Sequence, residues 1–504
     1  MLHAKVPKCN HRLDRTTFST SREMDFFSKK ELINQTGHDC FEWPLVIVKE
    51  LVDNAIDASE EASVAPIIQV CCDSTGISVA DNGPGLPETA LIGQLDFKVR
   101  VSSREAYVSP CRGAQGNALK TLFPMPYVLD PKHGKVIVEA QGSRHTISCG
   151  ADPLSQRAII NRDKSKLGKS KKLQISNGKE NLGFSCGTFF RLEWEPNPNG
   201  WPFDPDYDFD FWFSYVSNLI DGFALFNPHL SIELNWFGQK HKCWIATDKK
   251  WKKWLPSDPT SPHWYMQTNI ERLIGAYITH ERDAGLNGDG KLVNDFLAEF
   301  DGLTGSAKRS RVLGDAGLKR MRLSELAADG KLDTDRITKL LAAMQRHTRP
   351  VKSQGLGLIG EDHFKARILE MGCLPESFQY EKELDKPPKV KTDENGEDQK
   401  PRFLPCVVES AFGWRREKSE ERRGIFVDRR RIFAGVNWSA AIKNPFRNFG
   451  STGEGLEADL NKLKAGGYEP IIFALHLAHP RVSYTDRGKS ALVIEGDGAE
   501  EDAR

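Results

Sequence analysis

Residues 45–61 read LVIVKELVDNAIDASEE, and the rest of the chain is organised around this stretch. At about 3.6 residues per turn, it predicts a helix with a polar strip formed by Glu50, Asp53, Asn54 and Asp57. The opposite strip is apolar and must pack against another layer of the protein. We expect no Lys or Arg to be spaced for pairing with these acids, and such a face suits a metal ion. Taken alone, the pattern favours a solvated acidic face.

Two glycine-bearing turns follow this helix in the sequence. Residues 79–85 read VADNGPG, a strand end that enters a turn, where Asp81 could accept a hydrogen bond from an exocyclic amine. Residues 112–120 read RGAQGNALK, a loop that leads into a helix and whose free backbone N–H groups could hold phosphates. This loop is not a Walker A motif, because the GKS/T ending is missing. Each signal is weak alone, but the three together favour a nucleotide site.

In this order the three motifs resemble the N, G1 and G2 boxes of the GHKL ATPases. Within that superfamily, the first motif and residues 24–27 (MDFF) are most similar to the B subunit of topoisomerase VI. The resemblance implies an α+β fold with a Bergerat-fold α/β sandwich, a helix-two-turn-helix-like insert and a transducer-like α/β domain of ribosomal S5 type. It extends over about residues 20–492. The family continues into a long helix beyond this point, so we expect a shortened C-terminus here.

The resemblance also implies roles for single residues, with ATP and Mg²⁺ as cofactors. Glu50 would be the general base that activates water, and Asn54 would carry Mg²⁺. Asp81 would hold the adenine amine, in the turn that contains Gly83 and Gly85. The chemistry agrees, because hydrolysis of a γ-phosphoanhydride needs a positioned water, a carboxylate, a cation and donors around the phosphates.

Further nucleotide contacts are implied in other parts of the chain. Thr188 resembles part of a Gly-Thr element near the adenine, and Ser103 and Arg104 stand where the family tends to have Ser-Lys. Lys489 resembles the transducer lysine that reaches across to the γ-phosphate, and we expect it to be catalytic. The residues that would wrap the triphosphate are Gly113, Ala114, Gln115, Gly116, Asn117, Ala118, Leu119 and Lys120. Ala118 departs from the family, because a glycine is frequent there.

Composition limits the class of protein. The 504 residues exceed one hydrophobic core and suggest two to four domains. With 70 basic and 69 acidic residues, the net charge says nothing about nucleic acid. The ten cysteines include no CxxC pair, which favours reduced thiols in the cytoplasm. The N-terminus lacks the apolar core of a signal peptide, and no apolar run approaches the roughly 18 residues of a membrane span.

We divide the chain into three domains. Residues 1–235 form the ATP-binding domain with an N-terminal dimerisation segment, and strands are expected at 135–140, 189–194 and 230–236. Residues 157–172 carry a run of Lys and Arg that is typical of a mobile solvated loop. The alternative is that this run contacts DNA phosphates.

Residues 262–362 are expected to be helical, with helices at 294–300, 307–316 and 335–346. Residues 355–364 (GLGLIGEDHF) resemble the segment that closes the helix-two-turn-helix insert in the B subunit of topoisomerase VI. Several basic residues in this domain are candidates for DNA contact, although any exposed helix can carry such charge. They are Lys308, Arg309, Arg311, Lys319 and Arg320.

Residues 363–504 are expected to form the transducer-like domain. The apolar pattern predicts strands at 403–410, 423–428 and 471–478, and residues 455–464 suggest a helix. Residues 380–402 are rich in Lys, Asp, Glu and Pro, and we expect a disordered loop there because the segment has too little apolar content to pack.

The function implied by the resemblance is the ATPase subunit of a type IIB topoisomerase-like complex, an ATP-dependent homodimeric clamp on duplex DNA. No catalytic tyrosine context or acidic TOPRIM pattern is evident, so a cleaving partner similar to the A subunit of topoisomerase VI would be a separate chain. The alternative is a stand-alone clamp that senses or remodels DNA in a mobile-element or anti-phage defence system. A chaperone is disfavoured by the helical insert, and a histidine kinase by the lack of a phosphoacceptor-histidine helix.

Overall fold

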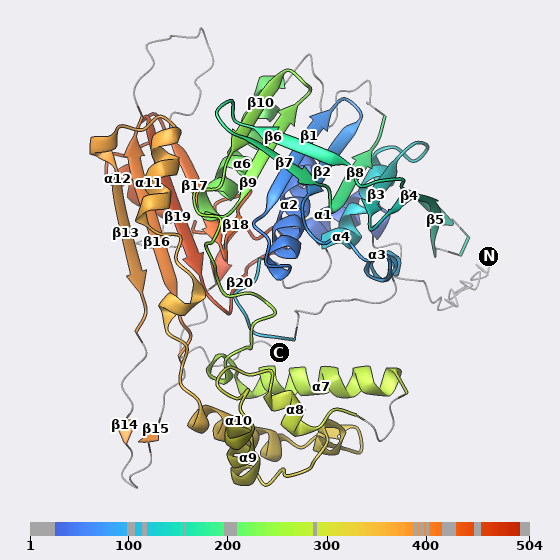
Figure 1. Ribbon diagram of the computed structural model, residues 1–504, viewed down its shortest axis with the longest axis vertical. Helices are drawn as coiled ribbons and strands as arrows, with labels where there is room; N and C mark the ends of the chain where they lie inside the picture. The colour runs from blue at the N-terminus through green and yellow to red at the C-terminus, as the bar shows by residue number, and fades with distance from the viewer. Residues whose placement is uncertain are drawn as a thin grey trace, which may run out of the picture.

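The chain forms a mixed α+β structure in a computed structural model, as the sequence predicts. Two sheets stand side by side, and a group of helices lies below both in the view of Figure 1. The structure describes residues 26–97, 106–112, 118–152, 154–155, 157–195, 209–285, 290–386, 391–392, 398–399, 403–415, 430–447 and 455–493.

The larger sheet has eight strands in the order β10-β9-β1-β2-β8-β3-β4-β5. Its strands are β1 (Ile67–Asp73), β2 (Gly76–Asp81), β3 (Lys135–Ala140), β4 (Ser143–Asp152), β5 (Arg157–Lys166), β8 (Thr188–Glu193), β9 (Ser231–Trp236) and β10 (Lys240–Trp244). β1 pairs with β9 in parallel, and the other pairs are antiparallel. The three strands predicted for this domain are confirmed within one residue, as β3, β8 and β9. A hairpin of β6 (Lys172–Ser176) and β7 (Asn181–Ser185) lies beside this sheet.

Helix α2 (Trp43–Glu61) is the predicted central helix, and it packs on β2 and against α6 (Phe209–Phe226), which covers β9 (Figure 1). It begins with Pro44 in its first turn, where a missing backbone N–H costs no hydrogen bond. The predicted apolar strip is confirmed, because Val48, Val52 and Ile56 have no exposed surface. Each fully buried aliphatic side chain of this kind contributes about 1.5–3 kcal/mol. Two shorter helices of this unit are α1 (Lys29–Thr36) and α4 (Ala118–Leu122).

The prediction of a mobile loop over residues 157–172 is wrong for most of its length. Residues 157–166 form β5, the edge strand of the larger sheet, which pairs with β4 from Arg157 to Lys166. Its side chains are mostly exposed, so the strand can carry many charges without a burial cost. Lys and Arg on an edge strand also discourage pairing with strands of other chains.

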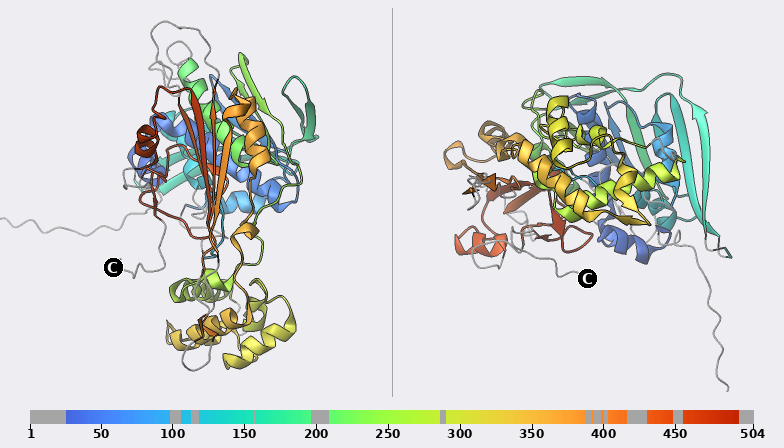
Figure 2. Two further views of the ribbon diagram at one scale, coloured as in Figure 1. Left: turned by 90° about the vertical axis from the view of Figure 1, so that its left-hand side faces the viewer. Right: turned by 90° about the horizontal axis from the view of Figure 1, so that it is seen from below.

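The helical unit contains α7 (Gln267–Asp283), α8 (Val293–Leu297), α9 (Ser306–Asp315) and α10 (Thr334–His347). The last three match the predicted helices. They pack around side chains without exposed surface, including Phe296, Phe300 and Leu340. Figure 2 shows this unit as a separate lobe below the two sheets.

The second sheet has five strands in the order β13-β16-β19-β17-β18. They are β13 (Gln379–Leu384), β16 (Val407–Trp414), β17 (Arg431–Val436), β18 (Ser439–Ala440) and β19 (Ile471–Ala478). Helix α11 (Glu361–Glu370) packs on one face near β16, and α12 (Leu456–Lys462) lies on the other face (Figure 2). The predicted strand 471–478 and the helix predicted at 455–464 are confirmed.

Two predictions for this unit need correction. The first part of the expected disordered loop, residues 380–384, belongs to β13, which pairs along β16. Such a strand can be charged, because an edge strand forms backbone hydrogen bonds while its charged side chains stay in water. The Tyr380 hydroxyl also donates a hydrogen bond to Glu409 over 2.8 Å. The strand expected at 403–410 begins at Val407, because Pro405 cannot donate to a sheet ladder. The strand expected at 423–428 lies outside the described residues.

Across the ranges that the structure describes, every helix is too short or too polar to cross a lipid bilayer.

Candidate active site

The polar strip of α2 divides into two rows with different surroundings. Asn54 is exposed, and the Glu50 side chain retains 23% of its surface. Asp53 and Asp57 are buried, with 6% exposure each. The two rows run along neighbouring lines of the helix, since residues four apart lie on one face. Only the row of Glu50 and Asn54 is therefore open to a ligand.

The expectation that no Lys or Arg pairs with these acids is wrong. Lys49 Nζ lies 2.8 Å from Asp53 Oδ2 and 3.7 Å from Glu50 Oε1. Arg112, without side-chain exposure, lies 2.7 Å from Asp57 Oδ1 through Nη1. Lys49 stands four residues before Asp53, a spacing that brings helical side chains together, so the sequence could have indicated this pair. Arg112 is far from α2 in the sequence, so no local spacing indicates that it pairs with Asp57.

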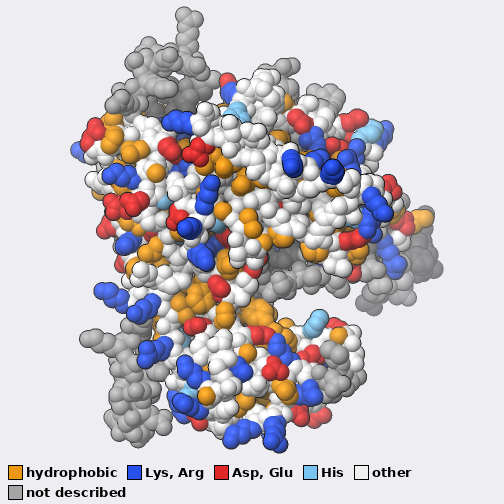
Figure 3. All heavy atoms as spheres, viewed as in Figure 1, with side chains coloured by type: hydrophobic (Ala, Val, Ile, Leu, Met, Phe, Trp, Pro, Cys, Tyr) orange, Lys and Arg blue, Asp and Glu red, His pale blue; other side chains and the backbone are white. Residues whose placement is uncertain are grey.

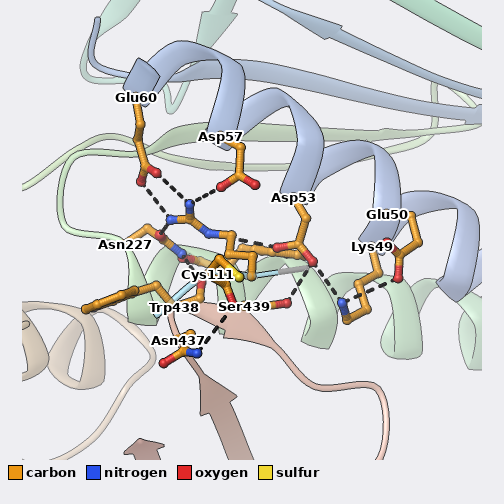
Figure 4. A network of polar contacts seen from close by, with 12 residues as sticks. Lys49, Glu50, Asp53, Asp57, Glu60, Cys111, Asn227, Asn437, Trp438 and Ser439 are labelled. Atoms are coloured by element: carbon orange, nitrogen blue, oxygen red, sulfur yellow. Dashed lines mark hydrogen bonds and ion pairs between the residues drawn. The ribbon is translucent and has the colours of Figure 1, made fainter. Parts of the chain in front are cut away.

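A buried network surrounds Arg112, and Figure 4 shows its partners Asp57, Glu60 and Asn227. Its Nη1 lies 2.6 Å from Glu60 Oε2, and its Nη2 donates to Glu60 Oε1 over 2.7 Å and to Asn227 over 2.5 Å. Asn227 donates in turn to the backbone carbonyl of Trp438, over 2.9 Å, in the turn between β17 and β18. Lys253 adds a second cation, 3.0 Å from Glu60. Arg112 thus ties α2 to the second sheet, directly before the predicted phosphate loop.

The segment 106–112 also contacts the helical unit. Tyr107 donates to Glu299 over 2.9 Å, and the Val108 N–H donates to the Tyr265 hydroxyl over 3.0 Å. Thr260 donates to the Val108 carbonyl over 2.6 Å. The chain between the Ser103–Arg104 pair and the 113–117 loop is therefore attached to all three units.

Lys489 lies close enough to Glu50 and Asp53 of α2 for their charges to act on it. It belongs to the turn between β20 (Ser483–Tyr484) and β21 (Leu492–Val493). The turn is fixed by Gly37 and Gly488, because a Cβ on Gly37 would come within 2.0 Å of the Gly488 nitrogen. The charge of Lys49, together with burial, lowers the pKa of Lys489, while Glu50 and Asp53 act in the opposite direction.

Two opposing effects set the pKa of Glu50. Burial would raise it, but Lys49 and then Lys489 hold it below the ordinary value of a glutamate. The Glu50 carboxylate is thus ionised near neutral pH and can accept a proton, which is what a general base needs.

Asp81 lies at the end of β2, in the predicted G1 turn. Its Oδ1 accepts the N–H of Gly83 over 2.8 Å and that of Thr188 over 3.3 Å. Gly187 packs so closely that a Cβ there would come within 1.9 Å of the Gly83 carbonyl oxygen. The structure therefore brings together Asp81, Gly83 and the Gly-Thr pair. Gly85, at φ +85°, adopts a backbone conformation that favours glycine.

Burial raises the pKa of Asp81 to about 6, although the Gly83 and Thr188 N–H groups act against it. A raised carboxyl pKa favours folding below the unfolded value of about 3.9, and this contribution is lost as the pH rises through about 6. Asp81→Asn should thus be more stable than the wild type at pH 7.5, by up to about 3 kcal/mol, with no difference near pH 4. Urea denaturation between pH 4 and 8 measures this.

Asp73→Asn is the matched control for that series. Burial would raise the pKa of Asp73, but Arg191 and Thr75 hold it below its ordinary value. Its replacement should therefore lose stability above about pH 4, the opposite sign. If Asp81→Asn is less stable than the wild type at pH 7.5, burial does not destabilise the ionised Asp81 carboxylate.

The remaining predicted nucleotide contacts are only partly described. Three parts of the predicted site lie outside the described residues: Ser103, Arg104 and the loop 113–117. Ala118 begins helix α4, but its side chain is not described either. Leu119 packs against the core. Lys120 donates to the Asp96 backbone carbonyl over 2.6 Å.

The exposed carboxamide oxygen of Asn54 fits a Mg²⁺ ligand. This ion keeps several waters and typically takes one or two protein oxygens plus phosphates. Asn54 would supply one such oxygen, and water and the phosphates would supply the others.

Four of the five basic residues predicted to contact DNA are exposed on the helical unit. Lys308, Arg311, Lys319 and Arg320 are exposed. Basic side chains gather on the lower side of this unit in Figure 3. Arg309 differs, because it donates to Asn294 over 3.1 Å and to the Leu303 and Thr304 carbonyls. Its guanidinium is used within the unit.

Several curated proteins are similar in sequence to part of this chain. They come from Methanosarcina mazei (33% identical over 119 residues), Archaeoglobus fulgidus (42% over 76) and Halobacterium salinarum (28% over 218). All three are named as the B subunit of type 2 DNA topoisomerase 6. The resemblance to this B subunit is confirmed. The matched parts cover 22%, 14% and 42% of this chain.

The likeness to the B subunit of topoisomerase VI is partial. The same matches cover 19%, 12% and 24% of those proteins, so the chain spans about a fifth of the length of the curated relatives it matches. No protein-family model matches the chain. Similarity to solved structures is weak. The N-terminal domain of a DNA repair protein matches with a TM-score of 0.37 and 12% sequence identity, and the match covers 89% of this chain and 87% of that domain.

Proposed function

We propose that the chain is the ATP-binding and ATP-hydrolysing subunit of a type IIB topoisomerase-like complex, an ATP-gated dimeric clamp that acts on duplex DNA. The observation that carries this proposal is that Lys489, from the second-sheet unit, lies close enough for its charge to act on Glu50, which stands one turn before Asn54 on α2. The sequence similarity to the B subunit of topoisomerase VI supports it.

In the proposed site, ATP lies over the polar row of α2. Asp81 would accept a hydrogen bond from the adenine amine, with Gly83 and Thr188 beside it. Asn54 would hold Mg²⁺, which offsets negative charge on the phosphate oxygens. The residues of the 113–120 loop would surround the phosphates with backbone N–H groups.

Glu50 would act as the general base of the hydrolysis. A water oxygen bonds to the γ-phosphorus, the bond between that phosphorus and the bridging oxygen breaks, and Glu50 takes a proton from the water. ADP and inorganic phosphate are the products. Lys489 would meet the γ-phosphate, so its contacts would differ between bound ATP and bound ADP.

Binding of ATP would close a homodimer through the N-terminal residues, and hydrolysis would release it. Binding energy specific to the γ-phosphate has to favour the closed form, because a ligand with equal affinity for both forms shifts nothing. Exposed basic residues of the helical unit would contact DNA phosphates. A separate chain similar to the A subunit of topoisomerase VI would cut the DNA, and the complex would work in the cytoplasm.

ATP turnover by the purified chain, with and without duplex DNA, tests this proposal. We expect turnover to rise with duplex DNA, and Lys489→Ala to lose this rise. Lys462→Ala, a change on the remote helix α12, should behave as wild type. A wild-type chain that neither binds nor hydrolyses ATP would rule the proposal out. Duplex-stimulated turnover without strand passage, even with a cleaving partner added, would favour the stand-alone clamp.

A further inference from the structure

We propose that Lys49 is a positioning residue for the Glu50 carboxylate, and that Asp53 and Ser439 hold Lys49 in the place from which it acts. This inference rests on the proposed function, because it concerns the base of the proposed hydrolysis. It adds a residue from the second-sheet unit to the machinery around that base.

Lys49 is unusual because its side chain is 7% exposed. A buried ammonium is retained only where anions surround it. Here the anions are Asp53, whose Oδ2 lies 2.8 Å away, and Glu50, whose Oε1 lies 3.7 Å away. The ammonium therefore bridges the buried Asp53 carboxylate and the partly exposed Glu50 carboxylate that would meet water.

Asp53 is fixed by a second donor from another part of the chain. Ser439, the first residue of β18, donates to the same Asp53 Oδ2 over 2.7 Å (Figure 4). The other Asp53 oxygen receives no hydrogen bond from any residue in the described ranges, and Arg112 Nε is 3.9 Å from it. Ser439 and Lys49 therefore share one oxygen, and the hairpin of β17 and β18 helps to determine where Lys49 sits.

Other charged groups around Glu50 do not replace Lys49. His38 and Lys489 also act on the Glu50 carboxylate, but burial lowers the pKa of His38, which leaves it neutral near pH 7. Burial raises the pKa of Tyr484 beside Lys49, so that phenol is neutral as well. Lys489 sits in a turn and would be drawn to the γ-phosphate. Lys49 is then the cation that stays with Glu50 through the cycle.

The chemical consequence concerns the protonation of the base. Burial favours the neutral acid, which cannot accept a proton from water. A cation within about 4–6 Å favours the carboxylate, typically by 1–3 pKa units. Lys49 thus opposes burial, and it also orients the carboxylate by attraction to Oε1.

The test compares Lys49→Met, Lys49→Arg and wild type by two measurements. The Glu50 carboxyl is titrated by NMR of ¹³Cδ-labelled glutamate and assigned with Glu50→Gln, and the pH profile of kcat is recorded. In Lys49→Met, the Glu50 pKa and the acidic limb of kcat should both move up by about 1–3 units. Lys49→Arg keeps the positive charge, so both values should stay close to those of the wild type. Ser439→Ala should raise the Glu50 pKa and the acidic limb of kcat by a smaller amount than Lys49→Met.

Lys443→Met is the matched control, because Lys443 pairs with the partly exposed Glu42 over 2.8 Å and is not among the charged groups that act on the Glu50 carboxylate. It should not move either value. A Glu50 pKa that is unchanged in Lys49→Met would overturn the inference, even if kcat falls. Should the wild type not turn over ATP, the proposed function fails, but the NMR titration still decides whether Lys49 acts on Glu50.

Discussion

Replacement of Arg112 by methionine is expected to destabilise the protein by about 3–5 kcal/mol at pH 7. The guanidinium is without side-chain exposure, and it neutralises Asp57 and Glu60, whose side chains are 8% and 4% exposed. Methionine would fill a similar volume but leave these carboxylates in a medium of low dielectric without their main counter-charge. Lys253 remains as a weaker counter-charge for Glu60, and the Asn227 link is lost outright.

The measurement is urea denaturation of the full chain, followed by tryptophan fluorescence at several pH values. Burial would raise the pKa of Glu60, but Arg112 and Lys253 hold it well below the ordinary value. This contribution is present above the unfolded value of about 4.3 and is lost as the pH falls through the lower folded value. Without Arg112 the carboxyl protonates more readily, so the deficit of Arg112→Met should shrink as the pH falls towards about 4.

Arg336→Met provides the matched control for this substitution. Arg336 also pairs with an aspartate, at 3.2 Å from Asp333, but the two side chains are 51% and 39% exposed. An exposed pair is worth about 0–1 kcal/mol. Equal effects of the two substitutions would show that the Arg112 network does not hold α2 to the second sheet.

The parts of the site that the sequence predicts are those determined by local patterns. The apolar strip of α2, the strand β3 and the G1 turn follow from spacings of two to four residues, which a short stretch of chain reveals. The pairing of Lys49 with Asp53 was available at the same scale, because the two residues are four apart. The expectation of an unpaired acidic face overlooked it.

Contacts between distant parts of the chain could not be predicted in this way. Ser439 reaches Asp53 across 386 positions, and nothing around Ser439 indicates that contact. Arg112 reads as the start of a phosphate loop, and only the fold shows that its side chain turns inward to Glu60. The edge strands β5 and β13 have the charged composition of a loop, because an edge leaves charged side chains in water.

Replacement of Glu50 by glutamine is expected to slow ATP turnover by about 10²- to 10⁴-fold, the usual contribution of a general base. Glutamine keeps the size of the side chain but cannot accept a proton from water. ATP affinity should change little, because the proposed adenine and phosphate contacts lie on Asp81, Asn54 and the 113–120 loop. Steady-state kinetics and binding of a fluorescent ATP analogue measure the two effects.

Glu61→Gln is the control for this substitution, because Glu61 is exposed at the end of the same helix and should leave turnover unchanged. Measuring kcat and affinity together separates a base from a residue that only repels the triphosphate. Neutralising a residue that only repels the triphosphate would tighten ATP binding and leave kcat unchanged, whereas loss of the base lowers kcat at nearly constant affinity. Turnover that survives in Glu50→Gln would place the base elsewhere, and among the acids of the α2 polar strip only buried Asp53 and Asp57 would be left, both already paired with cations.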